Sequence, residues 1–366
     1  MKTKTHRKEI NAESPNFFCE NCRAIYYCSD ECRIACTSGR NGDHDRNACM
    51  RLAEEVSLFE QLVKKTEGGA EDELLGVQES ACNELKRLGV HKHREYRREC
   101  SCFDFVPFGE LVYNELRSVS TYEEYIASEL QYFRKLLRDV NDGDADWVQK
   151  HARVDHLPFS IAQNILKFNL DIIMESSVLR VYIAGCEKEF DTFERVAKKI
   201  YALTSRDDDS TTRRMEVYFV GPELSKRLHN TVVSFYDGKL QCILLKGLLG
   251  TSAELEGGAP PDIVYCPNAG VAIYTFEWHA AVRWCILNAK GRKKGCLMLF
   301  SDYTFEAAWK GYELLLQWIV EQGAERRTIL PVCENAWKHP TLRKHERVTT
   351  KQVREYSNGF IFGFST

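Results

Sequence analysis

Short apolar runs alternate with helical periods through the second half of the sequence. The runs are rich in β-branched and aromatic side chains and recur at 179–184, 215–220, 231–236, 239–245, 262–266, 296–300, 328–332 and 360–364. Between them, residues 191–203, 277–289 and 304–322 carry apolar side chains at helical spacing. This alternation predicts an α/β domain whose largely parallel sheet is covered by helices on both faces.

Local signals refine this pattern. Asp191 followed by Glu194 resembles a capping box that opens the first helix, and Gly323 stands where a glycine would end the last one. Asp237-Gly238 separates two strand-like runs, which is typical of a β-hairpin. We therefore expect a Rossmann-like mixed sheet, parallel for the most part and antiparallel where the hairpin lies.

The first half of the sequence has a different texture. A helical period begins at Leu52, and two further helical stretches cover 122–140 and about 160–170. The sequence predicts four parts: a disordered tail over 1–18, a cysteine-rich zinc-bound finger over 19–49, a helical linker region over 50–176, and the α/β domain over 177–366. The predicted fold class is thus α+β with a small finger, a helical middle and an α/β C-terminal half.

Composition excludes several classes of protein. The 366 residues are 44% hydrophobic and 28% charged with a net charge of −3, which are globular values and too close to neutral for a dedicated nucleic-acid binder. No apolar stretch approaches the roughly 20 residues that cross a bilayer, so we expect no membrane partner. No secretory pattern follows Met1. We expect an intracellular protein, cytoplasmic in the first place, with the mitochondrion and the nucleus as open alternatives.

Cysteine usage is uneven along the chain. Six of the 15 cysteines fall between residues 19 and 49. In a reducing compartment such a cluster indicates metal ligands rather than disulfides. Five of the others lie in or beside apolar runs, where a cysteine acts as a small hydrophobe: Cys186, Cys242, Cys266, Cys285 and Cys296.

The N-terminal cluster has the spacing of a zinc site. The segment CENCRAIYYCSDEC spans 19–32 and is followed by Cys36, His44 and Cys49. A C-x-x-C pair closed by a distant His and Cys supplies the four ligands that tetrahedral structural Zn2+ requires. Zinc would also supply folding energy that so short a segment lacks.

This spacing resembles the MYND zinc finger, in which eight ligands hold two zinc ions in a cross-braced pattern. The resemblance assigns Cys19 and Cys22 to ligand pair two, Cys28 and Cys32 to pair three, and His44 and Cys49 to pair four. One zinc site, formed by pairs two and four, is then complete.

The family's first ligand pair is missing, because no C-x-x-C precedes Cys19. Cys36 or His6 could help complete the second site, and Asp45 is a rival to His44 as a ligand. The resemblance implies a protein partner. Arg33 replaces a residue that shapes the family's proline-rich peptide groove, so that ligand is not expected.

The C-terminal half resembles the C-terminal domain of mitochondrial splicing suppressor-like proteins. The motifs that carry this resemblance occur in order over about residues 105–366: LPFSIAQNIL (157–166), VYFVGPELS (217–225), VVSFYDG (232–238), PPDIVYCPNAG (260–270), FSDYT (300–304) and YSNGFIFGF (356–364). The resemblance implies an interaction or scaffold protein linked to translation or gene-expression regulation.

An enzyme is the alternative. The strand at 179–184, Gly185 and the helix at 191–203 could form the first unit of a Rossmann-like S-adenosylmethionine-dependent methyltransferase, with Glu223 on a ribose and Asp262 or Asn268 facing substrate. Against this, Gly185 stands alone, and the bulkier sequence Cys186-Glu187-Lys188 follows it. Glu187 and Glu189 would also repel a pyrophosphate. No match to a SET-type methyltransferase motif is present.

Other polar clusters have ordinary structural explanations. We expect His91, His93, Cys100 and Cys102 to form a solvated basic helix end. We expect His279 to be a partly buried structural histidine, and Trp309 and Trp318 to lie in the core. A basic run could contact RNA but is more typical of a solvated loop: Lys338, His339, Arg343, Lys344, His345 and Arg347. The sequence alone thus favours a non-catalytic zinc-binding interaction protein, with the methyltransferase as the alternative and an RNA-associated regulator as a third hypothesis.

Overall fold

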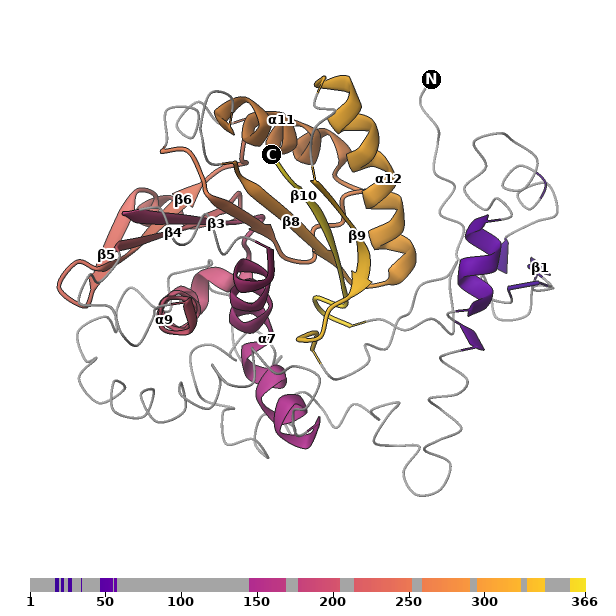
Figure 1. Ribbon diagram of the computed structural model, residues 1–366, viewed down its shortest axis with the longest axis horizontal. Coiled ribbons are helices and arrows are strands. Elements are labelled where there is room, and N and C mark those ends of the chain that lie inside the picture. Colours follow the sequence, from indigo (N-terminus) through magenta and orange to yellow (C-terminus); the bar gives the residue numbers. More distant parts are fainter. Residues whose placement is uncertain are drawn as a thin grey trace. The chain divides into compact units, whose positions relative to one another are not determined.

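The computed structural model describes residues 17–19, 21–22, 26–27, 34, 47–54, 56–57, 145–168, 177–204, 214–251, 259–289, 295–323, 328–339 and 356–366. Contacts divide the chain into two compact units (Figure 1). The first comprises Met1–Val77 and Leu342–Glu355, and the second comprises Gln78–Thr341 and Tyr356–Thr366. Within the described residues no helix is long and apolar enough to cross a membrane.

The first unit contains a small hairpin and a helical segment. Strands β1 (Phe17–Phe18) and β2 (Tyr26–Tyr27) pair antiparallel, and residues 47–54 and 56–57 are helical. Leu52 and Val56 are buried with Cys22 in a minimal core. The predicted helix is confirmed over residues 52–54 and 56–57, but the chain is already helical at residue 47, so the predicted start at Leu52 is too late. The predicted stretch at 122–140 lies outside the described part of the chain.

An eight-stranded sheet forms the centre of the second unit. Its strands are β3 (Val178–Ala184), β4 (Arg214–Gly221), β5 (Thr231–Phe235), β6 (Leu240–Lys246), β7 (Ile263–Cys266), β8 (Leu297–Asp302), β9 (Thr328–Glu334) and β10 (Phe360–Ser365). Their spatial order is β5-β6-β4-β3-β7-β8-β10-β9. Each predicted apolar run is a strand, so the predicted mixed sheet is confirmed.

The sheet is parallel in its centre and antiparallel toward its edges. Strands β6, β4, β3, β7 and β8 are mutually parallel, and β10 runs antiparallel between β8 and β9. Strand β5 pairs antiparallel with β6 through the turn at Asp237-Gly238, as the sequence predicts. From β3 the chain builds outward to β4 and β6, and then returns to place β7 on the other side of β3. Ligands of open α/β sheets bind at such a reversal of strand order, beyond the carboxyl ends of the strands.

Helices cover both faces of the sheet (Figure 1). Helices α7 (Ala145–Phe168) and α9 (Phe193–Thr204) pack on one face, and α11 (Thr275–Ala289) and α12 (Phe305–Glu321) pack on the other. Each face has its own apolar core, and strands β3, β4, β7 and β8 contribute alternate side chains to both. This is the Rossmann-like arrangement of a sheet flanked by helices.

A buried ion group joins the two helices on the first face. Helix α7 is kinked at Asp155, where φ is −123° and ψ is 21°, three residues before Pro158. The Asp155 carboxylate accepts a hydrogen bond from Arg195 Nε at 2.9 Å and is also bonded by Lys199, both on α9. Burial alone would raise the pKa of Asp155, but the charges of Arg195 and Lys199 outweigh burial and hold that pKa below its ordinary value. Helix α7 is thereby attached to the α/β core.

The predicted helix ends are confirmed at one helix and wrong at another. Gly323 follows α12 with φ +63° and donates its N–H to Val320 O, as a glycine after a helix C-terminus does. Asp191 instead belongs to a 3-10 turn, η2 (Lys188–Asp191), and α9 begins at Phe193, so the predicted helix start at Asp191 is two residues too early.

The scattered cysteines lie where the sequence places them. Cys186, Cys242, Cys266, Cys285 and Cys296 are all buried in the two sheet cores. Burial raises the pKa of the Cys186, Cys242, Cys266 and Cys285 thiols, so these four stay neutral and pack as small apolar side chains.

Candidate functional site

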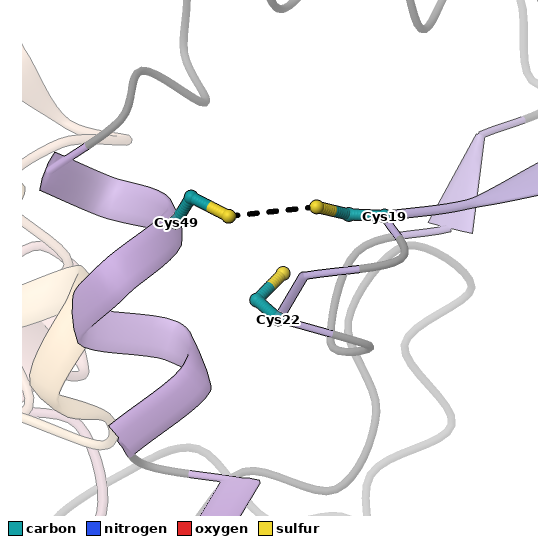
Figure 2. Close-up of side chains that lie close together, drawn as sticks. All are labelled: Cys19, Cys22 and Cys49. Atoms are coloured by element: carbon teal, nitrogen blue, oxygen red, sulfur yellow. Dashed lines mark hydrogen bonds between the residues drawn. The ribbon is translucent and has the colours of Figure 1, made fainter.

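Three of the six predicted zinc ligands converge in the first unit. The sulfur atoms of Cys19, Cys22 and Cys49 all lie within 4.8 Å of one another, and those of Cys19 and Cys49 are 3.5 Å apart. Figure 2 shows Cys49 on the helical segment, facing the turn that carries Cys19 and Cys22. Residues 30 positions apart are thus brought together by the packing of Leu52 and Val56 against Cys22.

These separations fit a tetrahedral metal site. A zinc–sulfur bond of about 2.3 Å in tetrahedral geometry places sulfur atoms about 3.8 Å apart, and the 3.5 Å between the Cys19 and Cys49 sulfurs is close to that. A fourth ligand would complete the set, and His44 is the predicted one. Together with Cys28 and Cys32, and with the alternatives Cys36, His6 and Asp45, it lies outside the described residues.

The three thiols influence one another. Burial disfavours a thiolate at Cys19, but hydrogen bonds from the Cys22 backbone and from the Cys49 side chain outweigh it and lower the pKa of Cys19. Burial and the neighbouring Cys19 raise the pKa of Cys49 to about 12. The thiols of Cys19 and Cys49 are thus shifted in opposite directions by the contact between them.

A second candidate site lies where β3 and β4 end. Gly185 follows β3 in a left-handed conformation, with φ +81°, and is exposed. The next residue, Cys186, donates its N–H to Val220 O at 2.9 Å, and a side chain at Gly221 would collide with the Cys186 carbonyl, 2.0 Å away. Glycine at 185 and 221 therefore lets the chain after β3 lie against the end of β4.

The sequence places bulkier side chains directly after Gly185, but the first of them, Cys186, does not occupy the space beyond the ends of β3 and β4. The Cys186 side chain is fully buried in the core below, and its thiol donates to Ile183 O at 3.0 Å. Glu187 and Lys188 are exposed. The Glu187 N–H is already bonded to the Glu189 carboxylate at 2.9 Å, so Glu189 is a structural acceptor of this turn.

Three carboxylates gather around the ends of these strands. Glu223 is exposed two residues after β4. Burial, then Glu189 and then Glu223 raise the pKa of Glu187, while Lys188 lowers it. Glu223 therefore lies close enough for its charge to act on Glu187. Lys246 holds this loop by donating to the carbonyls of Pro222 and Leu224 on either side of Glu223.

Trp278 forms a wall beside Gly185. Two atoms of its indole ring lie 3.1 and 3.2 Å from the position that a Cβ on Gly185 would occupy. The indole N–H donates to Ala269 O at 2.7 Å, and the ring packs edge-on against Phe300. Only 8% of Trp278 is exposed, so its ring is a fixed part of the sheet edge between β3 and β7.

The alternative substrate-facing residues have other roles. Asn268, after β7, uses its whole side chain internally: Oδ1 accepts from Asn358 N at 2.7 Å, and Nδ2 donates to Ser357 Oγ at 3.1 Å. Asp262 precedes β7, at the opposite end of the strand, where its carboxylate accepts from Arg180 N at 2.9 Å. Asp262 therefore lies at the other end of β7 from the site, and the Asn268 side chain is held by hydrogen bonds within the protein.

Sequence reasoning missed the residues that fix the loop after β7. Asn358, in a left-handed turn with φ +54°, accepts from Ser301 Oγ and Tyr265 OH, and its carbonyl accepts from Asn335. The Asn358-Gly359 pair before the last strand is a turn signal that could have drawn attention to it. Its partners are distant in sequence, so spacing alone could not predict the network.

The two described residues of the basic run, Lys338 and His339, make contacts within the protein. Lys338 bonds Glu334 and lies over the Tyr356 ring, and the His339 ring meets His156 edge-on. The rest of the basic run, like the predicted cluster at His91, His93, Cys100 and Cys102, lies outside the described residues.

Two of the aromatic predictions are confirmed and one is wrong. His279 packs on Trp318, 3.6 Å from Glu321, and Trp318 is buried. Trp309 is half-buried and donates to Glu313 at the surface, so its predicted core position is wrong.

Comparison with known proteins adds little beyond the fold. No protein-family model and no curated protein matches the sequence. Among solved structures, the chain is similar to a Listeria monocytogenes protein assigned as a class I S-adenosylmethionine-dependent methyltransferase. The similarity has a TM-score of 0.31 at 12% identity, and it covers 86% of this chain and 80% of that protein.

Proposed function

We propose that the α/β unit binds S-adenosylmethionine at the carboxyl ends of β3 and β4 and acts as a methyltransferase. The observation that carries this proposal is the pairing of exposed, left-handed Gly185 after β3 with exposed Glu223 after β4. In Rossmann-like sites a glycine after the first strand admits the cofactor to the backbone, and an acidic residue after the second strand binds the ribose hydroxyls. The sequence alone favours a non-catalytic protein; this geometry favours the alternative.

The strand order supports the same proposal. The last strand, β10, lies antiparallel between β8 and β9, and strands β6, β4, β3, β7 and β8 are parallel in that order. This is the arrangement of a Rossmann-like methyltransferase fold, with one additional edge strand, β5. Gly185 lies at the reversal of strand order between β3 and β7, where such sheets bind ligands, and Glu223 follows the neighbouring strand β4.

Charge selects among adenosine-containing cofactors. Glu187, Glu189 and Glu223 surround the edge, and Lys188 is the one cation among the charges that shift the pKa of Glu187. A dinucleotide would bring a pyrophosphate against these carboxylates and be repelled. S-Adenosylmethionine carries no phosphate and is cationic at sulfur, so the same carboxylates favour it.

The residues present fit this cofactor on its adenosine side. Gly185 is exposed and has the Trp278 indole on the side where a Cβ would lie, Glu223 can accept from two ribose hydroxyls, and the Cys186 side chain is turned into the core. Trp278 bounds the site toward β7 with a rigid apolar wall. When bound, the cofactor supplies a methyl group on a sulfonium sulfur. Glu187 adds an exposed carboxylate after β3, at the same edge of the sheet.

Calorimetry with S-adenosylmethionine tests the proposal. We expect micromolar binding by the wild type and a loss of about tenfold or more in Glu223→Gln, because a charge-assisted hydrogen bond to the ribose is weakened. Asp237→Asn is the matched control. It also removes one exposed carboxylate, but in the β5–β6 turn at the opposite ends of the strands, and asparagine tolerates its left-handed φ of +54°. No binding by the wild type, or equal loss in both variants, would refute the site.

A second function is supported by the cysteine cluster. We propose that the first unit is a MYND-like zinc finger that presents a surface to a protein partner. The convergence of Cys19, Cys22 and Cys49 supports it, since three thiol ligands from two segments form most of one tetrahedral set. Elemental analysis of the purified protein tests this, with about one tightly held zinc per chain as the expected result. A stoichiometry of two would mean that Cys28 and Cys32 complete the second site with Cys36 or His6, and absence of zinc would refute the finger.

A further inference from the structure

An exposed apolar ledge borders the proposed cofactor site. Residues 272–276, which end the loop after β7 and form the first two residues of α11, are all exposed, and the three large side chains among them are Ile273 (71% exposed), Tyr274 (56%) and Phe276 (76%). Single exposed apolar side chains are ordinary on protein surfaces, but a contiguous group of this kind marks a contact surface. Aromatic residues are also enriched where proteins bind one another.

The ledge is held in a fixed conformation. Gly270 is left-handed, with φ +55°, and its carbonyl accepts from Ile273 N at 2.8 Å and from Tyr274 N at 3.0 Å. The Tyr274 carbonyl in turn accepts from Trp278 N at 3.1 Å, in the first turn of α11. These apolar side chains are therefore displayed by an ordered turn, so little conformational entropy is lost when something binds them.

The ledge and the proposed cofactor site share Trp278. Its indole contacts Gly185 on one side, and its main chain closes the turn that carries Tyr274 on the other. A partner lying on 272–276 therefore lies beside the carboxyl end of β3. The ledge belongs to the same edge of the sheet as Glu187.

Charge around the ledge favours a basic partner. Glu277, in the first turn of α11, and Glu187 and Glu189, after β3, are the carboxylates of the two segments 185–189 and 272–278. Lys188 is their one cation, so the two segments carry three negative charges and one positive charge. A nucleic acid would bring phosphates toward these carboxylates, whereas a lysine or arginine would be attracted to them.

We infer that residues 272–276 dock a protein segment that combines apolar side chains with a lysine or arginine, the apolar groups lying on Ile273, Tyr274 and Phe276 and the basic group reaching the carboxylates beside Gly185. This names the partner class of the methyltransferase site and rests on that proposed function. Apolar contact on the ledge supplies affinity, and the carboxylates select the charge of the partner.

Peptide binding to the full chain tests the inference. The probes are a short fluorescent peptide of Lys, Phe and Leu, its counterpart with Glu in place of Lys, and oligouridine, each measured by anisotropy. We expect the basic peptide to bind and Phe276→Ser to weaken it about tenfold, since a phenylalanine contact is lost. Leu287→Ser is the matched control, because it removes an exposed leucine (46% exposed) from α11 outside the ledge. This control should bind like the wild type.

Results that would contradict the docking surface can be told apart from results that would contradict the cofactor site. Equal or tighter binding of the acidic peptide, competition by oligouridine, or equal loss in Phe276→Ser and Leu287→Ser would each overturn the docking surface. Calorimetry with S-adenosylmethionine on the same variants separates the two proposals. If the cofactor binds Phe276→Ser normally and no peptide binds the wild type, the ledge inference alone fails. If the basic peptide binds as expected and the cofactor does not bind, the methyltransferase fails and the ledge stands as an interaction surface.

Discussion

The Asn268 side chain accepts a hydrogen bond from the main-chain N–H of Asn358, 90 positions later, at 2.7 Å. Both asparagines have left-handed backbone conformations, with φ of +46° and +54°, and each lies at the turn of its loop. Through this bond the turn before the last strand fixes the loop after β7, whose Ala269 carbonyl holds the Trp278 indole beside Gly185. A contact between two loops thus sets one wall of the proposed site.

Substitutions at Asn268 should separate the contribution of its side-chain hydrogen bond to stability from that of its left-handed backbone. Asn268→Gly keeps the left-handed backbone but leaves the buried Asn358 N–H without its acceptor, which should lower the free energy of unfolding by about 1–3 kcal/mol. Asn268→Ala adds the strain of a left-handed alanine, about 1 kcal/mol more. Chemical denaturation of the three proteins measures both differences. Equal stability of the glycine variant and the wild type would show that the hydrogen bond contributes nothing.

The strands were predictable and this network was not. Runs such as 215–220 and 296–300 combine β-branched, aromatic and apolar side chains, because central parallel strands are buried on both faces, so composition alone identifies them. The helix start at Phe193 was missed because a 3-10 turn precedes it. The partial exposure of Trp309 was missed because the helical spacing of apolar residues does not show which edge of the apolar face meets solvent. Asn268, Ser301 and Asn358 meet only after the sheet has formed, and no local signal encodes such a meeting.

The candidate sites were predictable to different degrees. Cys19 and Cys22 share a C-x-x-C motif, and this spacing alone indicates a metal site. Gly185 and Glu223 were identified because each follows a recognisable strand. The ledge at 272–276 was not identified, because its apolar residues resemble the start of a buried helix until the exposure of each side chain is known.

Asp155 should make stability depend on pH at the acid end. Its pKa in the folded protein is below its ordinary value, so its stabilising charge is present above an unfolded-state pKa of about 3.9 and is lost as pH falls through the folded-state pKa. Asp155→Asn leaves Arg195 and Lys199 without this carboxylate and should cost about 3 kcal/mol at pH 7. Denaturation at pH 7 and at successively lower pH should show the gap between wild type and variant closing. A gap independent of pH would show that packing, not charge, causes the loss.

Glu187 and Glu189 should have opposite effects on stability. The raised pKa of Glu187 means that its charge opposes folding at neutral pH, so Glu187→Gln should raise the melting temperature slightly at pH 7. The gain should vanish below about pH 4, where both the folded and unfolded states carry a protonated carboxyl group. Glu189→Ala should lower the melting temperature, because the Glu187 N–H loses its acceptor. Changes of the same sign in the two variants would contradict these separate roles.

Removal of one cysteine should unfold the first unit and spare the second. Cys22 is 1% exposed and packs with Leu52 and Val56 besides belonging to the thiol cluster, so Cys22→Ser should abolish zinc binding and the local core together. The α/β unit has its own two cores and should melt at nearly the wild-type temperature. Calorimetric melting with zinc analysis measures both effects. Cys333→Ser is the control, since Cys333 is an exposed thiol on β9 outside the cluster, and this variant should keep its zinc. A single cooperative melt shifted as a whole by Cys22→Ser would show instead that the two units fold together.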